Sequence, residues 1–529
     1  MKSAVAIIAV FLIALPVFAV ADFSTAEDSG EIKIGAYTYS LIDNTNEVEL
    51  ISYDNLNDAS DVIIPAEIID DKTGNHYDVT RVSAWFASEK IKTITIGENV
   101  EVIEDFIFNC QNLRSFAVSG GTHFSAPDDV LYTYNQHKLI RYPVAKTGTS
   151  YEVLPSVAEI GACAFYESSL ETVILHEGII KMDSSAFYCC ANLSNLRTGS
   201  YDHTLPDSLS IIGNAVFGDC TKLTSITLPE GLVFIGTRAF ANTGISEMLI
   251  PYEVDYIGEG AFMDCYKMTK FESYSETYWS DEKTGILYKE ENEDSYVLFA
   301  YPANSDMTEF EIPENVVNIA PFAFSGCQHL EKVTLNETTV NVPELAFCDC
   351  KSLKSINLDG IITIGSNSFS GCENLSAVNF GNSITYIGMC AFSRTALESV
   401  AIPSSVTYID YGAFQYCPQL SQVTISEGSK VTLDWDVFYN DTALKDITIE
   451  SGDVVLSSDS LCIGGYEGDT VTVNVHVVKG YTIPADATDE YTILYITIIG
   501  ERPYPWENWI GVFFCALVII GILYGMREV

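Results

Sequence analysis

The sequence predicts a mostly β solenoid, in which short coils stack on one another along the chain. One phrase recurs: Ile, then usually Ala-Phe, a small residue, Leu, and a closing Val/Ile-x-Ile/Leu, as in Ile212–Pro229. The phenylalanine of this phrase mostly returns every 22 to 24 residues. The last residues of the phrase alternate between apolar and polar with the period of a β-strand. A fixed repeat that ends in a short strand is typical of a solenoid.

Thirteen phenylalanines mark the register of the repeat. They are Phe86, Phe108, Phe165, Phe187, Phe217, Phe240, Phe262, Phe324, Phe347, Phe369, Phe392, Phe414 and Phe438. Each copy offers about six apolar side chains, worth about 1.5–3 kcal/mol each when buried. Ordering its residues costs about 1.5 kcal/mol per residue, so one copy is unstable alone. Stacking buries both faces of each coil, and we expect about 13 coils, each with one short strand parallel to the next.

Two longer intervals between marks contain insertions that resemble each other. Residues 129–132 and 139–143 match residues 285–288 and 298–302, and both pairs of segments end in Tyr-Pro. Each insertion reads as two short strands around a polar turn. We therefore expect two hairpins that project from the stack, near residues 119–150 and 272–305.

The repeated phrase resembles that of a known family. Ile-Gly-x-x-Ala-Phe-x-x-Cys-x-x-Leu-x-x-Ile-x-Ile-Pro is typical of the BspA-like (Treponema-type) leucine-rich-repeat surface proteins, with close matches at Ile257–Phe271, Ile364–Phe380 and Ile409–Ile425. The resemblance covers roughly residues 80 to 450. It implies a leucine-rich-repeat curved rod that is secreted or anchored at the surface. It also implies a role in adhesion to host proteins, other cells or matrix.

The two ends of the chain indicate its compartment. A cationic start, an uncharged apolar run and Ala19-Val20-Ala21 are typical of a cleaved secretory signal. Trp509–Met526 is an uncharged 18-residue stretch that would span roughly 27 Å as a helix. The expected order is a signal peptide (1–21), an N-terminal β cap (22–80), the solenoid (81–450), a membrane-proximal β region (451–505), one transmembrane helix (506–526) and a short cytoplasmic tail (527–529). The body would then lie outside the cell.

The charge of the chain excludes one class of function. The 27 Lys and Arg against 72 Asp and Glu give a net charge of −45, which repels nucleic-acid phosphates. No catalytic motif stands out: His176-Glu177 opens like a zinc-protease helix, but Ile180 occupies the position of the second ligand. We expect no enzyme activity, no cofactor and no metal site.

Cysteines occupy one position of the repeat in seven coils. They are Cys190, Cys220, Cys265, Cys327, Cys350, Cys372 and Cys417. Neighbouring coils would bring these residues within bridging distance. However, Ser168, Thr243, Thr395 and Asp441 fill the same position in other coils, which favours a small side chain that hydrogen-bonds within the coil. Both a ladder of free thiols and scattered disulfides remain open, with the thiols favoured.

The middle residue of each closing Ile-x-Ile triplet should point away from the core. This row is mostly small and polar, so a glycan or an extended protein could lie along it and contact many weak points. The alternative is that threonine simply suits an exposed strand. The candidate ligand residues are Thr227, Thr334, Asn357, Asn379, Thr424 and Thr448.

Four Asn-x-Ser/Thr sequons are candidate N-glycosylation points of a secreted chain. They begin at Asn192, Asn336, Asn374 and Asn440. In the expected membrane helix, Gly521 and Gly525 form a GxxxG step that could pair two chains as a homodimer.

The sequence therefore predicts a membrane-anchored cell-surface protein that binds an extracellular protein or glycan, for adhesion or for cell–cell or host interaction. A second hypothesis is a structural component of the cell envelope that self-associates laterally. A third is an enzyme hidden in a flanking β region.

Overall fold

The computed structural model describes residues 31–43, 45–54, 59–464, 471–488 and 492–498. Two compact units divide the chain: Met1–Gln111 with Val118–His123, and Asn112–Ala117 with Phe124–Val529. The expected signal peptide lies outside the described residues.

The first unit is built on a sheet of order β1-β2-β3-β6-β5, with β8 pairing β6. Strands β1 to β3 are antiparallel neighbours, whereas β3, β6 and β8 run parallel. Beside this sheet β4 pairs with β7 in parallel. The bounds are β1 (Glu31–Ile34), β2 (Tyr37–Leu41), β3 (Glu47–Tyr53), β4 (Asp61–Ile64), β5 (Glu67–Ile69), β6 (His76–Val82), β7 (Thr93–Ile96) and β8 (Val102–Ile103), with β9 (Ser115–Val118) at the division between the units.

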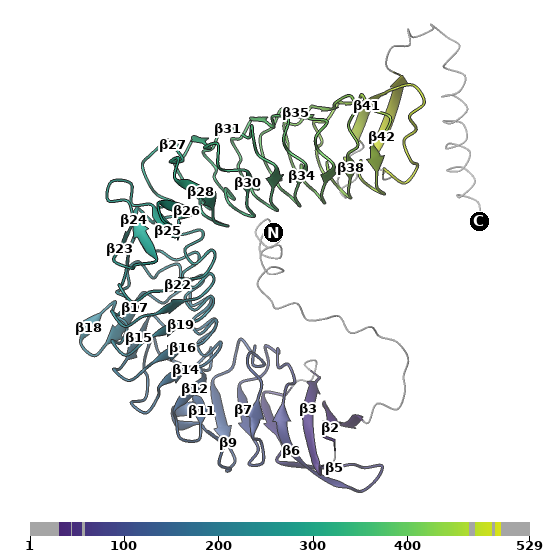
Figure 1. Cartoon of the computed structure of the whole chain (residues 1–529). Helices are drawn as coiled ribbons and strands as arrows, with labels where there is room; N and C mark the ends of the chain where they lie inside the picture. Colours follow the sequence, from purple (N-terminus) through teal and green to yellow (C-terminus); the bar gives the residue numbers. More distant parts are fainter. Residues whose placement is uncertain (1–30, 44, 55–58, 465–470, 489–491, 499–529) are drawn as a thin grey trace. The chain divides into compact units, whose positions relative to one another are not determined.

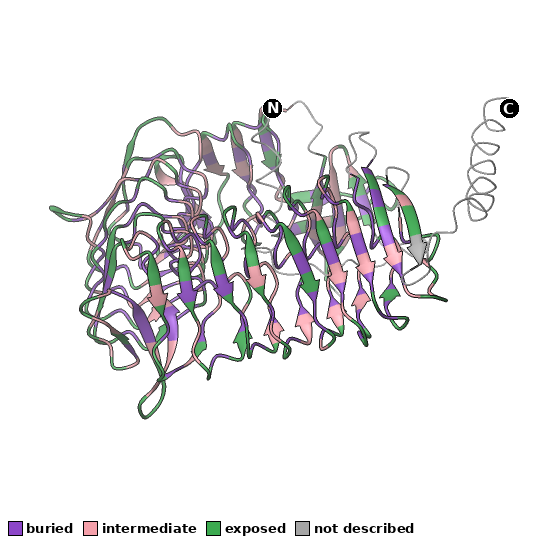
Figure 2. Ribbon diagram, turned by 90° about the horizontal axis from the view of Figure 1, so that it is seen from above, coloured by how far each residue is buried: buried purple, intermediate pink, exposed green. Residues whose placement is uncertain are grey.

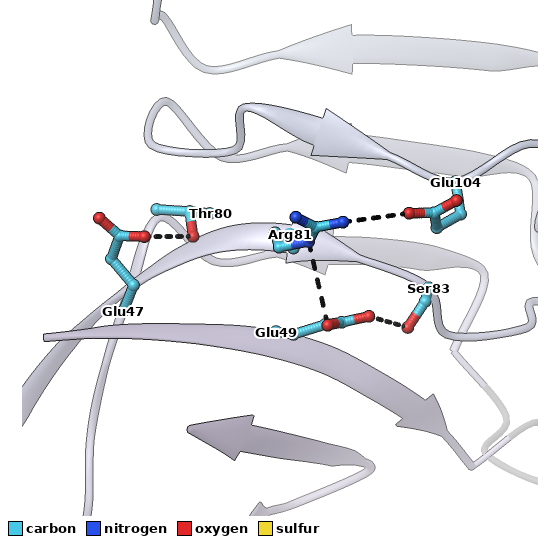
Figure 3. Close-up of polar contacts among 6 residues, drawn as sticks. All are labelled: Glu47, Glu49, Thr80, Arg81, Ser83 and Glu104. Carbon is cyan, nitrogen blue, oxygen red and sulfur yellow. Dashed lines mark hydrogen bonds and ion pairs between the residues drawn. The ribbon is translucent and has the colours of Figure 1, made fainter. Parts of the chain in front are cut away.

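Polar side chains connect the parallel strands of the first unit, as Figure 3 shows. Arg81 on β6 lies between Glu49 on β3 (Nε to Oε2, 4.0 Å) and Glu104 beyond β8 (Nη2 to Oε1, 3.4 Å). Beside it, Thr80 donates to Glu47 at 3.2 Å, and Ser83 donates to Glu49. Because Arg81 and Glu104 are exposed, these ion pairs contribute about 0–1 kcal/mol each and mainly orient the side chains.

The second unit is a stack of coils that carries strands on two sides. Within it, Figure 1 shows β31 and β35 along one edge and β30, β34 and β38 along the opposite edge. The longer strands are β13 (Ser150–Glu152), β15 (Thr172–Leu175), β17 (Asn195–Thr198), β21 (Glu247–Ile250), β23 (Lys270–Ser273), β27 (Glu309–Glu311), β29 (Lys332–Thr334), β31 (Ser355–Asn357), β33 (Ala377–Asn379), β35 (Ser399–Ile402), β37 (Gln422–Ile425), β39 (Asp446–Ile449), β41 (Val471–Val477) and β42 (Thr492–Ile498). The two-residue β18 (Tyr201–Asp202) pairs antiparallel with β17.

The opposite side carries mostly two-residue strands, also parallel from coil to coil. They are β14 (Glu159–Ile160), β16 (Lys181–Met182), β19 (Ile211–Ile212), β20 (Phe234–Ile235), β22 (Tyr256–Ile257), β28 (Val316–Ile319), β30 (Asn341–Val342), β32 (Thr363–Ile364), β34 (Tyr386–Ile387), β36 (Tyr408–Ile409), β38 (Thr432–Leu433) and β40 (Val455–Leu456). We call the two sides the long-strand face and the short-strand face. The predicted single strand per coil is wrong, since most coils carry a second, shorter one.

The interior of the stack is a ladder of phenylalanine rings. Neighbouring rings from Phe165 to Phe262 and from Phe324 to Phe438 lie 4.6–5.9 Å apart at interplanar angles of 4–21°. Isoleucine, leucine and valine from both faces close around the rings, so strands such as β21, β35 and β41 alternate buried residues with more exposed ones (Figure 2). The register marks from Phe165 to Phe438 therefore lie in one continuous core.

The glycine of the Ile-Gly step allows the coils to approach closely. A Cβ at Gly258 would lie 2.2 Å from the backbone nitrogen of Thr237 in the preceding coil, and one at Gly365 would lie 2.5 Å from that of Glu344. Such contacts are too short for a side chain at Gly258 or Gly365. The glycine therefore permits the close approach of neighbouring coils at these two positions.

The cysteines of the repeat are free thiols that donate to the preceding coil. In six coils the Sγ lies 2.9–3.2 Å from the carbonyl oxygen of the previous register phenylalanine, as Cys372 does with Phe347. Burial raises the pKa of the Cys372 thiol well above its ordinary value, which keeps the proton available for this bond. The free-thiol alternative is thus the one that the structure shows among the described cysteines.

The two insertions pair with strands of the short-strand face. The first comprises β10 (Phe124–Ser125), a 3₁₀ turn (Pro127–Asp129), β11 (Leu131–Thr133) and β12 (Lys138–Arg141); the second comprises β24 (Tyr278–Ser280), β25 (Leu287–Asn292) and β26 (Ser295–Ala300). Each is antiparallel inside, and its last strand pairs in parallel with the next short strand, β14 or β28. Each insertion thereby continues the stack at its last strand.

The predicted fold class needs one correction. The structure is a leucine-rich-repeat β-solenoid, and the 3₁₀ turn at Pro127–Asp129 is the one helical element among the described residues. No helix in that part of the chain has the length and apolar character to cross a membrane. The expected transmembrane helix (506–526) lies outside the described residues, and nothing in the structure supports its place in the fold class.

Candidate ligand-binding face

Three of the predicted ligand residues form a contiguous row on the long-strand face. Thr334, Asn357 and Asn379 each end a strand, β29, β31 and β33, in three successive coils. The central residue of each strand points inward, and all three row residues are exposed. Asn357 and Asn379 are direct partners in the parallel register. The alternation of the sequence thus brings these side chains together on the surface.

The two asparagines are held in place by hydrogen bonds. Asn379 donates from Nδ2 to Oδ1 of Asn357 at 3.1 Å. The backbone N–H of Asp359 donates to the same Oδ1 at 3.2 Å, and that of Gly381 donates to Oδ1 of Asn379 at 3.2 Å. Each side chain therefore stabilises the turn that follows its strand. The orientations of both amides at the surface are therefore fixed by hydrogen bonds.

The row borders a shallow concavity of about 430 Å³. Its lining is the whole of three strands: Lys332–Thr334, Ser355–Asn357 and Ala377–Asn379. The sequence prediction included only the last residue of each strand and missed Lys332, Ser355 and Ala377. These residues lie two positions earlier, on the same side of the strand, so the period of two already placed them there.

The other predicted ligand residues lie elsewhere on the long-strand face. Thr424 and Thr448 are direct partners on β37 and β39, and both are half-buried. Thr227 is exposed and makes an isolated bridge with Thr204. The structure therefore brings Thr334, Asn357 and Asn379 together, and Thr424 and Thr448 together, but does not join all six in one sheet.

Comparison with protein families identifies the repeat. The family described as "BspA type Leucine rich repeat region" matches in six copies, over residues 78–138, 198–280, 298–361 and 341–461. The chain belongs to this family. The resemblance seen in the sequence is thereby confirmed. No curated protein matches this BspA-type chain.

Several solved structures are similar to this BspA-type protein. A leucine-rich cell surface protein of Faecalibacterium prausnitzii is 23% identical, with coverage of 79% of this chain and 94% of that one and a TM-score of 0.44. A leucine-rich-repeat protein of Eubacterium ventriosum is 18% identical, with coverage of 82% and 93% and a TM-score of 0.47. The pneumococcal vaccine antigen PcpA is 17% identical, with coverage of 89% and 99% and a TM-score of 0.43.

The four sequons of the BspA-type protein lie on turns with different environments. Asn336 donates from Nδ2 to the carbonyl oxygens of Pro313 and Val316, at 2.6 and 2.8 Å. A glycan on this nitrogen would leave one N–H for two acceptors. Asn374 is exposed and donates once, to Lys351, whereas Asn192 accepts from Lys222, and Asn440 has a positive φ of 59°. Asn336 is therefore the least suited of the four to modification.

Two further predictions concern a dimer contact and metal binding. Gly521 and Gly525, the proposed dimer contact, lie outside the described residues. Within the described part of the chain, no group of three or more His, Cys, Asp or Glu side chains is arranged to hold a metal ion.

Proposed function

We propose that the protein is a non-enzymatic binding protein of the cell surface, and that its recognition site is the long-strand face at β29, β31 and β33. The observation that carries the proposal is the concavity of about 430 Å³ with its row of oriented, uncharged side chains. Solenoids use such extended surfaces to bind long ligands through many weak contacts. Membership of a family of repeat proteins supports a binding role for the chain.

The chemistry of the face favours an extended polar ligand, a glycan chain or a peptide in extended conformation. Thr334, Ser355, Asn357 and Asn379 offer hydroxyl and amide groups in neighbouring coils. Charge enters only at one end of the concavity, where Lys332 on β29 lies 3.8 Å from Glu309 on β27. The ligand would thus be recognised by hydrogen bonding along the row.

An array of glycans and extracellular-matrix proteins tests the proposal. The first variant is Asn357→Lys with Asn379→Lys, which places two cations in the row. Because these asparagines also stabilise turns, the second variant is Ala377→Lys, which crowds the concavity and removes no side-chain hydrogen bond. We expect a dose-dependent array signal for the native protein and its loss in both variants.

The matched control is Asn341→Lys with Thr363→Lys, which makes a similar change on the short-strand face of the same coils. If both long-strand variants bind like the native protein, this face is not the recognition site. Sedimentation of the native protein alone tests lateral self-association. If the native protein forms extended assemblies and Ala377→Lys does not, the occupant of this face is a second copy of the chain and not a glycan or peptide.

A further inference from the structure

A second surface, on the short-strand face, has a different chemistry. Along the corner that follows each short strand, most coils carry a small or polar residue, such as Ser184, Asn214, Thr237, Glu344, Ser366 and Ser458. Three consecutive coils instead carry Met389, Tyr411 and Trp435. All three are exposed, with 57% of Trp435 and 39% of Tyr411 accessible. An exposed aromatic run at a normally polar position indicates an interaction surface.

A second departure from the repeat occurs in two of these coils. Asp410 and Asp434 occupy the position that is glycine in the Ile-Gly step of other coils. At Gly258 and Gly365 an added Cβ would lie too close to the preceding coil. Each carboxylate accepts a hydrogen bond from a tyrosine of the preceding coil: Tyr386 reaches Oδ2 of Asp410 at 2.6 Å, and Tyr408 reaches Oδ2 of Asp434 at 2.5 Å. Two tyrosines and two aspartates are thus repeated in register.

The second oxygen of each carboxylate is also held. The backbone N–H of Tyr411 donates to Oδ1 of Asp410 at 2.7 Å, and that of Trp435 donates to Oδ1 of Asp434 at 2.8 Å. The rings of Tyr386 and Tyr408 are 6.1 Å apart and nearly parallel at 9°. Burial and the bond to Asp410 raise the pKa of Tyr386 to about 12, so its hydroxyl keeps the proton that it donates.

These residues form one charged and aromatic surface. We define the acidic aromatic face as Tyr386, Tyr408, Asp410, Asp434, Tyr411 and Trp435. Neither aspartate forms an ion pair with a lysine or arginine of the described part of the chain. The carboxylates therefore present negative charge beside the hydroxyls of Tyr386 and Tyr408, and each directly precedes an exposed aromatic residue in the chain.

We propose that the acidic aromatic face binds an arginine-bearing segment of a partner protein. A guanidinium group stacks on the exposed faces of Trp435 and Tyr411 through cation–π attraction, and its planar N–H groups reach the remaining lone pairs of Asp410 or Asp434. Because the hydrogen bonds above already fix the carboxylates, little side-chain entropy is lost on binding. The net charge of −45 attracts a cationic partner from a distance.

A neutral glycan is the main competing occupant, because sugars also stack on aromatic rings. It would make no use of the two fixed charges, which are the feature that distinguishes this face from an ordinary aromatic patch. The arginine proposal therefore predicts that binding depends on both the rings and the carboxylates, and that it weakens with salt.

The test is a titration of the purified full chain with three probes: a peptide of alternating Arg and Ser, the same peptide with Gln in place of Arg, and a neutral oligosaccharide of the chitin or cellulose type. We expect the arginine peptide to bind and the other two not to. Trp435→Ala should weaken its affinity about 2- to 30-fold, the range equivalent to 0.5–2 kcal/mol of cation–π energy. Asp410→Asn with Asp434→Asn should weaken it further and flatten its dependence on salt.

Matched controls are Tyr201→Ala, which removes another exposed aromatic residue, and Glu427→Gln, which removes an exposed charge from a neighbouring turn. Both should bind like the native protein. Three outcomes overturn the proposal: no binding of the arginine peptide, equal affinity for the native protein and Trp435→Ala, or binding of the oligosaccharide that Trp435→Ala abolishes. The variants at Asn357, Asn379 and Ala377 alter the long-strand face, so the two proposals fail separately.

Discussion

The two strand ladders of the second unit share one interior but have different surfaces. On the long-strand face at β29, β31 and β33, the outward residues other than Lys332 are small and uncharged, and a hydrogen bond between side-chain amides joins Asn379 to Asn357. On the short-strand face at β34, β36 and β38, the surface combines tyrosines with two aspartates. Since stacking fixes only the inward residues, each coil is free to vary outward. Both proposed binding sites therefore consist of outward residues.

The largest effect should come from breaking the shared interior. Phe369 is fully buried, with its ring 5.3 Å from Phe347 and 5.1 Å from Phe392. Phe369→Ala should lower the free energy of unfolding by about 3–5 kcal/mol, because the cavity cannot be filled by the rigid coils on either side. Urea unfolding measures this loss. A decrease of less than about 1 kcal/mol would mean that the ring ladder is not what joins the two faces.

The next prediction concerns the interior position that cysteine usually fills. In the coil of Phe438 this position is occupied by Asp441, whose side chain is fully buried. Its Oδ1 accepts from the backbone N–H of Cys417 at 2.6 Å, while Oδ2 has no partner among the described residues. Burial raises the pKa of Asp441 well above its ordinary value of 3.8.

A raised carboxyl pKa gives stability to the protonated folded state. That contribution is fully present below about pH 3.8 and is lost as the pH rises through the raised folded-state pKa. Asp441→Thr, which copies Thr243 and Thr395 of other coils, should therefore stabilise the protein by about 1–3 kcal/mol at pH 8 and much less at pH 4. Unfolding at the two pH values measures the difference. Equal effects at both would contradict the assignment.

Most of the interior could be predicted from the sequence, because it repeats. The alternation around Val333, Ile356 and Val378 also placed Thr334, Asn357 and Asn379 outward on one face. The short strands could not be predicted: two residues, as in Tyr386–Ile387, are too few to show a period. The acidic aromatic face was not predicted either, because its tyrosines and aspartates come from different coils. They meet only when neighbouring coils are in register.

A smaller loss of stability is expected from removing the surface hydrogen bonds of the long-strand face. Asn379→Ala removes the bond to Oδ1 of Asn357 and the acceptor for the N–H of Gly381. We expect a loss of stability of about 1 kcal/mol, because both bonds lie at the surface. Tyr386→Phe removes the bond to Asp410 on the other face and serves as its counterpart. Thermal unfolding of both variants shows whether the two faces are stabilised to the same degree. An unchanged stability of Asn379→Ala would mean that the hydrogen bonds of Asn379 do not stabilise this face.

The smallest effect on stability is expected at the charged end of the concavity. Lys332 and Glu309 are 3.8 Å apart with well-exposed side chains, so Lys332→Gln should change the free energy of unfolding by less than about 0.5 kcal/mol. If the long-strand face recognises its ligand by hydrogen bonds from neutral groups, the affinity of Lys332→Gln should also differ little from that of the native protein at low and at high salt. The acidic aromatic face should behave in the opposite way when Asp410 and Asp434 are neutralised. A strong salt dependence that disappears in Lys332→Gln would instead mean that a single cation dominates the long-strand face, and that the two faces do not differ in the way their chemistry indicates.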